Sequence, residues 1–75
     1  MKVVLNNVSK VQDFVNICSK FDFDIYMQSG RYIINAKSIM GILSLDLSKP
    51  VDVKPDTMDI STTQTFYENI VRFRE

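Results

Sequence analysis

Hydrophobic and polar positions follow two different periods along the chain, which separates expected strands from expected helices. The apolar, β-branched run Lys2–Leu5 predicts a first strand. Apolar residues then recur at helical spacing, at Val11, Phe14, Val15 and Cys18. The preceding segment has the form of a capping box, with Ser9 as N-cap and Gln12 at the N3 position. A first helix is therefore predicted from Ser9 to about Lys20.

A period of two then predicts a β-hairpin. In residues 23–28, apolar Phe23, Ile25 and Met27 alternate with Asp24, Tyr26 and Gln28. The loop is either Ser29-Gly30 or Gly30-Arg31, the second as a type II′ turn. Both loops pair Met27 with Tyr32 or Ile34, so the core face of the next strand should consist of Tyr32, Ile34 and Ala36. Ile33 and Tyr26 should share the opposite face as ordinary surface residues.

A second, short helix is predicted to begin after Ser38, whose hydroxyl can cap the free N–H groups of Met40 and Gly41. Gly41 weakens this helix, which should fade near Leu45. Residues 46–50 form an expected loop, and alternation in residues 51–54 predicts another strand. That strand should end at Pro55, bulge there or lie at a sheet edge, because proline cannot donate to a β-ladder.

The last third of the chain predicts a third helix. Ser61-Thr62-Thr63-Gln64 has the form of a second capping box. An apolar stripe follows and runs to the end of the chain, at Phe66, Tyr67, Ile70, Val71 and Phe73. The order β-α-β-β-α-β-α predicts an α+β fold in a single domain, residues 1–75. Its four-stranded, mainly antiparallel sheet should carry the helices on one face.

Charge and hydropathy exclude several classes of function. Nine Lys and Arg residues balance nine Asp and Glu residues, so no net field attracts nucleic acid or an anionic membrane. No apolar segment approaches the roughly 20 residues needed to span a bilayer, and no signal peptide is recognisable. A single cysteine cannot form an internal disulfide. We expect a cytoplasmic protein without a nucleic-acid or membrane partner.

The chain contains no histidine, which narrows the possible chemistry further. Ser–His and Cys–His nucleophilic pairs, histidine zinc ligands and phosphohistidine are all excluded. The single cysteine, Cys18, has no imidazole to activate it and is expected to be a small buried hydrophobe. We therefore expect no enzymatic activity, no metal site and no cofactor.

One segment carries a resemblance to a known family. The run Asn35-Ala36-Lys37-Ser38-Ile39-Met40-Gly41-Ile42-Leu43-Ser44-Leu45, between the hairpin and the fourth strand, resembles the N-[AL]-K-S-I-M-G-[VI]-[ML]-S-L segment of HPr. HPr is the histidine-containing phosphocarrier of the bacterial sugar phosphotransferase system. The similarity extends back through Cys18-Ser19-Lys20-Phe21-Asp22 and covers roughly residues 14–53. It implies the HPr fold, an open-faced β-sandwich.

The same resemblance implies that the carrier site is missing. In HPr, a G-x-H-A-R-P segment at the start of the first helix holds the phosphorylated histidine. Counted back without gaps from Phe14, the histidine position falls on Asn7, the arginine on Ser9 and the proline on Lys10. The nitrogen of an asparagine amide is not a usable nucleophile, because its lone pair is delocalised into the carbonyl. The chain thus resembles a divergent HPr without phosphocarrier activity.

A second working surface of the family is retained in the sequence. In many Gram-positive members, a serine at the start of the second helix is phosphorylated by a dedicated kinase, and the product helps a transcriptional regulator to bind. The matching residue is Ser38, which a role as N-cap alone also explains. Ile39, Met40 and Leu43 match the apolar patch that HPr presents to enzyme I, although some of them could instead belong to the core.

Three functional hypotheses remain open. The first is a monomeric, non-catalytic regulatory protein that binds an enzyme I-like protein, HPr kinase or a transcriptional regulator through the second helix. The second is a carrier that uses another nucleophile, Ser9 or Cys18. The third is a module that binds a small anion at the N-terminus of the first helix, near Asn6, Asn7 and Ser9.

Overall fold

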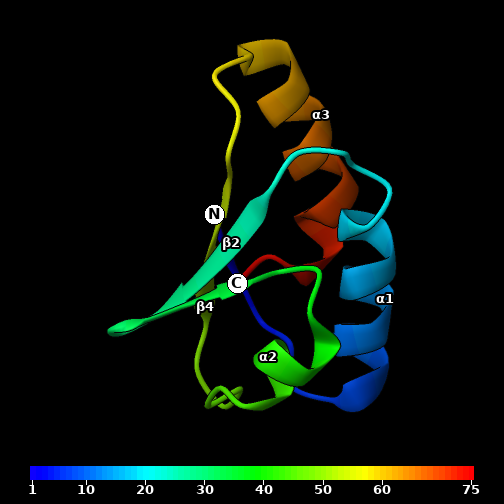
Figure 1. The fold of residues 1–75 in the computed structure, drawn as a ribbon. Coiled ribbons are helices and arrows are strands. Elements are labelled where there is room, and N and C mark those ends of the chain that lie inside the picture. The colour runs from blue at the N-terminus through cyan, green and yellow to red at the C-terminus, as the bar shows by residue number, and fades with distance from the viewer.

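The computed structural model describes residues 1–75 and has three helices on one side of a four-stranded sheet (Figure 1). Along the chain the elements are β1 (Lys2–Val3), α1 (Val8–Cys18), β2 (Ile25–Ser29), β3 (Tyr32–Asn35), α2 (Ile39–Leu43), β4 (Val51–Pro55), α3 (Ile60–Ile70) and the 3-10 turn η1 (Val71–Phe73). The strands lie in the order β1-β4-β2-β3, and every neighbouring pair is antiparallel. The predicted α+β class and element order are confirmed.

The β2–β3 hairpin selects one of the two predicted loops. Ser29 pairs with Tyr32, so the loop is Gly30-Arg31. Gly30 has a φ of +59° and no other residue type has a positive φ, which fits a type II′ turn. Met27 pairs with Ile34, which is one of the two partners that the sequence predicted.

Tyr32 corrects the predicted core face of β3. Ala36 is buried and Ile34 half-buried, but the Tyr32 side chain is 71% exposed. The hairpin extends past the helices (Figure 1), and Tyr32 directly follows its two-residue loop. Alternation identified the correct face of the strand, but not the point at which the helical layer ends.

The fourth strand is interior, because β4 pairs with both β1 and β2. Pro55 is its last residue and lies opposite Ile25. Of the three alternatives that the proline left open, the strand therefore ends there. A proline at this position removes no hydrogen bond from the middle of the sheet.

Both predicted capping boxes are wrong, because an Asx residue just upstream caps each helix instead. Asn7 caps α1, and its Oδ1 accepts a hydrogen bond of 2.8 Å from the backbone N–H of Lys10. Asp59 caps α3 and accepts from the N–H groups of Ser61 and Thr62. Short Asn and Asp side chains are among the strongest N-caps, so both helices begin two residues earlier than predicted.

The helix ends also differ from the prediction. α1 ends at Cys18 rather than near Lys20, where a turn follows. α3 does not continue to the end of the chain but tightens into η1. The chain then turns back along β1, where Val4 N–H donates to the Phe73 carbonyl at 2.7 Å.

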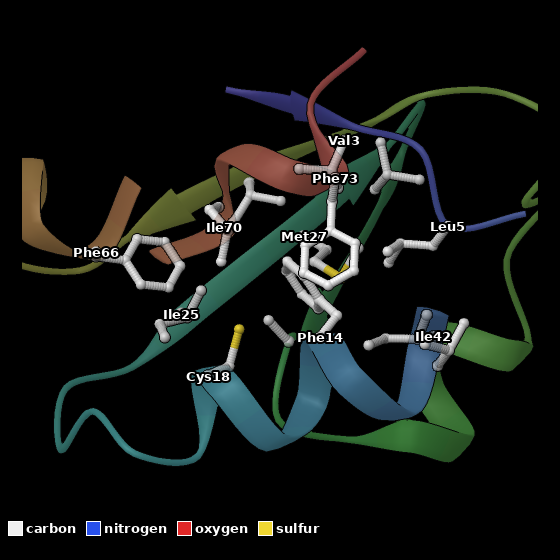
Figure 2. Packing of buried hydrophobic residues seen from close by; sticks show 14 residues of the cluster. Val3, Leu5, Phe14, Cys18, Ile25, Met27, Ile42, Phe66, Ile70 and Phe73 are labelled. Atoms are coloured by element: carbon white, nitrogen blue, oxygen red, sulfur yellow. The ribbon is translucent and has the colours of Figure 1, made fainter. Parts of the chain in front are cut away.

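A single cluster of 14 buried hydrophobic residues lies between the sheet and the helices (Figure 2). It includes Val11, Phe14 and Cys18 from α1, and Phe66 and Ile70 from α3. Phe14 packs edge-on against Phe73, with ring centroids 5.6 Å apart. Since a chain of this length buries a limited fraction of its surface, this cluster supplies most of its stability.

Candidate functional site

Asn7, the first residue of the candidate site along the chain, is the N-cap of α1. Its side-chain oxygen accepts from Lys10 N–H, and its backbone carbonyl accepts from Val11 N–H at 3.2 Å. The side chain is exposed, so an approaching phosphoryl donor could reach it. It would meet an amide whose nitrogen is not nucleophilic and whose oxygen already caps the helix.

Ser9 lies inside the first turn of α1 rather than at its cap. Its side chain is exposed and makes no hydrogen bond within the chain, so no base is positioned to activate the hydroxyl. The backbone N–H groups of Val8 and Ser9 also have no acceptor in the chain. Asn7 and Ser9 are therefore close together, as predicted, but they form no catalytic pair.

Cys18 lies at the other end of α1, away from both residues. Its side chain is fully buried in the hydrophobic cluster (Figure 2). Burial raises the pKa of the thiol to about 12, with a smaller opposing effect from the charge of Lys37. The reactive thiolate is therefore scarce at neutral pH, as expected for a thiol that serves as a small hydrophobe.

Ser38 caps α2, as predicted. Its backbone is extended, and its Oγ accepts from Gly41 N–H at 3.2 Å. Only the Gly41 donor is engaged, not that of Met40. A Cβ at position 41 would lie 3.2 Å from Ser38 Oγ, so glycine permits the close approach of this cap.

The helix that follows Ser38 presents two different faces. Ile42 is fully buried, and half-buried Ile39 packs against the core. Met40 and Leu43 point outward and are 75% and 41% exposed. Of the three residues predicted as a contact patch, two are therefore on the surface and Ile39 is partly in the core. We call Met40 and Leu43 the α2 patch.

Lys37 and Val8 lie by opposite ends of α1, and the sequence pattern did not single them out. The Lys37 ammonium donates to the Phe21 carbonyl at 2.6 Å and ties the start of α2 to the loop after α1. Val8 is 54% exposed in the first turn of α1, a helix that packs against α2 (Figure 1). Neither residue belongs to a periodic pattern in the sequence, since Lys37 is an isolated lysine and Val8 precedes Ser9, the predicted cap.

The remaining side chains show no arrangement for metal chemistry. No group of three or more His, Cys, Asp or Glu residues is placed to hold a metal ion. None of the helices combines the length and the apolar character that crossing a bilayer requires.

Comparisons with known proteins agree with this geometry. The family model described as PTS HPr component phosphorylation site matches residues 9–56, more than half of the chain. HPr-C-His from Thermoanaerobacter tengcongensis is similar in structure, with 26% identity and a TM-score of 0.73 over 93% of this chain and 85% of that one. No curated protein sequence matches.

A second similar structure is Crh of Bacillus subtilis, which is described as a catabolite repression protein and as an intertwined, domain-swapped dimer. It is 25% identical, with a TM-score of 0.70, and the alignment covers 97% of this chain and 82% of Crh. The matched segment contains Ser38 and the α2 patch, and it begins two residues after Asn7. The chain belongs to the HPr family, as a divergent member without a histidine.

Proposed function

We propose that this protein is a non-catalytic, cytoplasmic member of the HPr family that acts by protein contact through α2. The observation that carries the proposal is the exposure of Met40 and Leu43 directly after a capping serine. Methionine is well suited to contact surfaces, because its flexible side chain adapts to different partners. The family's partners, an enzyme I-like protein, HPr kinase or a transcriptional regulator, are the candidates to test.

The start of α1 supports the non-catalytic part of the proposal. Asn7 stands where the family's histidine is expected and uses its side-chain oxygen as the helix cap. Its amide cannot hold a phosphoryl group, and the exposed Ser9 hydroxyl has no base beside it. A phosphohistidine cannot form anywhere in a chain that has no histidine.

Phosphorylation of Ser38 is the proposed means of regulation. A phosphate there would add a charge of about −2 and three acceptor oxygens at the N-terminal end of α2, where negative charge is favourable. It would lie two residues from Met40, so it would change the charge of the α2 patch without entering the core. The similar protein Crh is described as a catabolite repression protein, which is consistent with a regulatory role.

Two phosphorylation reactions read by intact mass test this function. Incubation with enzyme I and phosphoenolpyruvate should add no phosphate, because no carrier nucleophile is present. Incubation with HPr kinase and ATP should add one phosphate. A phosphorylated product in the first reaction would overturn the proposal that the protein is not a phosphocarrier. Absence of a phosphorylated product in the second reaction would overturn the proposed regulation at Ser38.

Ser38→Asn is the sharpest variant for the second reaction. Asparagine preserves an N-cap, so α2 should remain folded while the phosphorylated hydroxyl is removed. Ser44→Ala is the control, since Ser44 is an exposed serine at the other end of the same helix. Phosphorylation should disappear in Ser38→Asn and persist in Ser44→Ala.

NMR titration separates partner binding from anion binding. Enzyme I should shift the amide resonances of Ile39, Met40 and Leu43 if α2 is the contact surface. The alternative function, a small-anion module, is favoured by the unpaired N–H groups of Val8 and Ser9. Inorganic phosphate that shifts the Asn7 and Ser9 amides, while enzyme I leaves α2 unchanged, would favour that alternative.

A further inference from the structure

A pocket lies beside the part of the β2–β3 hairpin that extends beyond the helices. It has a volume of about 610 Å³ and lies between the β2–β3 turn and the loop that follows α2. Arg31, Tyr32 and Ile34 line it from the hairpin, and Leu45, Asp46 and Lys49 from the loop. Its volume is within the range of about 300–1,000 Å³ that is usual for small-molecule sites.

The apolar part of this pocket is the uncovered continuation of the core face of the sheet. Ile34 and Leu45 are half-buried and pack against the hydrophobic cluster. Tyr32 is on the same face of β3 as Ile34, but its ring is 71% exposed. The pocket thus combines an apolar floor, made by Ile34 and Leu45, with the exposed ring of Tyr32, on which a flat group of a ligand could stack.

The charged groups of the pocket are unevenly engaged. Arg31 and Lys49 make no side-chain hydrogen bond within the chain. They also make no ion pair, since both ion pairs of the chain use Asp52 and join it to the N-terminus and to Lys54. The one carboxylate, Asp46, accepts from the Ser48 hydroxyl at 2.5 Å and from the Ser48 N–H at 3.1 Å. These bonds, with the nearby charge of Lys49, hold the pKa of Asp46 below its usual value. Arg31 and Lys49 are therefore both without an ion-pair partner, although Lys49 lies near Asp46, whose Oδ1 is hydrogen-bonded within its own loop.

We propose that this pocket binds a small organic anion in which a phosphate or carboxylate is attached to a flat ring system. The anionic group would pair with Arg31 and Lys49, and the ring would lie on Tyr32 over the floor of Ile34 and Leu45. Arginine and lysine both pair with such anions, and the guanidinium group also stacks on aromatic rings. Nucleoside monophosphates and aromatic carboxylates share this chemistry.

Titrations with four probes, followed by amide NMR, test the pocket. Adenosine monophosphate and 4-hydroxybenzoate represent the two sources, and adenosine and inorganic phosphate each supply only half of the chemistry. At least one of the first two should shift the amides of residues 30–32 and 45–49 at millimolar concentration and bind more tightly than either half. The proposal is wrong if neither complete probe shifts these amides, or if phosphate alone binds as tightly.

Charge variants test the assigned roles. Arg31→Gln and Lys49→Gln should each weaken binding about tenfold, because each removes one charge-assisted contact. Lys20→Gln is the matched control, since Lys20 is also exposed but does not line the pocket. All three changes are on the surface and should leave the unfolding midpoint unchanged. Equal affinity for the Lys49 and Lys20 variants would overturn the assignment.

Discussion

At the scale of single residues, Asn7 has a structural role at the start of α1. The position expected for a phosphorylated histidine holds an amide whose oxygen closes the first turn of α1. Such a side chain satisfies one of the donors that every helix leaves free at its start. Asn7 is therefore explained by the stability of α1, with no need for a role in phosphoryl transfer.

This explanation predicts the stability of three variants. Asn7→Ala should lower the free energy of unfolding by about 1 kcal/mol, because Lys10 N–H loses its acceptor. Asn7→Asp should retain the stability, since aspartate caps equally well and suits the helix dipole. Asn6→Ala, next to the cap, should change it by less than about 0.5 kcal/mol. Urea denaturation measures all three, and equal losses at positions 6 and 7 would contradict the role of the cap.

At the scale of elements, α2 separates a buried face from an exposed face within five residues. Ile42 is fully buried, and Met40 and Leu43 are exposed. Ile39 and Ile42, three positions apart, both turn toward the core, whereas Met40 and Leu43, also three apart, are exposed. The two faces can therefore be altered independently.

Two variants check that independence. Ile42→Ala should lower the free energy of unfolding by about 2–4 kcal/mol, because it leaves a cavity under α2. Met40→Ala should lower it by less than about 0.5 kcal/mol, since the side chain is already in water. Thermal or urea denaturation gives both values. If Met40→Ala proved as destabilising as Ile42→Ala, Met40 would belong to the core and could not form part of the α2 patch.

The elements also show what the sequence could and could not predict. The strand face that meets the core followed from period-two alternation, but the choice between the two hairpin loops did not. The Ser38 cap followed from its position before a short apolar run. The starts of α1 and α3 did not follow, because Asn7 and Asp59 compete with the nearby serines as caps. Side-chain chemistry alone does not decide between adjacent good caps.

The candidate site, like the fold, could be predicted from the sequence only in part. Local spacing placed Ser38, Met40 and Leu43 on one short helix, but it could not show that Ile39 leans into the core. The pocket beside Tyr32 was not predictable, because it depends on how far the hairpin projects past helices that are distant in sequence. Exposure set by long-range packing is the part that a periodic pattern does not contain.

At the scale of the whole molecule, the sheet has two edges that differ in how they are covered. β1 has only two residues, and the end of the chain lies along its outer side. Val3 bridges to Arg74, Val4 N–H donates to the Phe73 carbonyl at 2.7 Å, and Glu75 N–H donates to the Lys2 carbonyl at 3.1 Å. The β3 edge has no such cover, but it is only four residues long.

This arrangement predicts a monomer of 8.7 kDa in solution. The covered edge offers few free hydrogen-bonding groups, and the short β3 edge is a poor template for pairing with a second copy. The similar protein Crh is described as a swapped dimer, so the prediction distinguishes the two proteins. Sedimentation equilibrium over a range of micromolar concentrations measures the mass. A dimer mass that persists on dilution would contradict the predicted monomer.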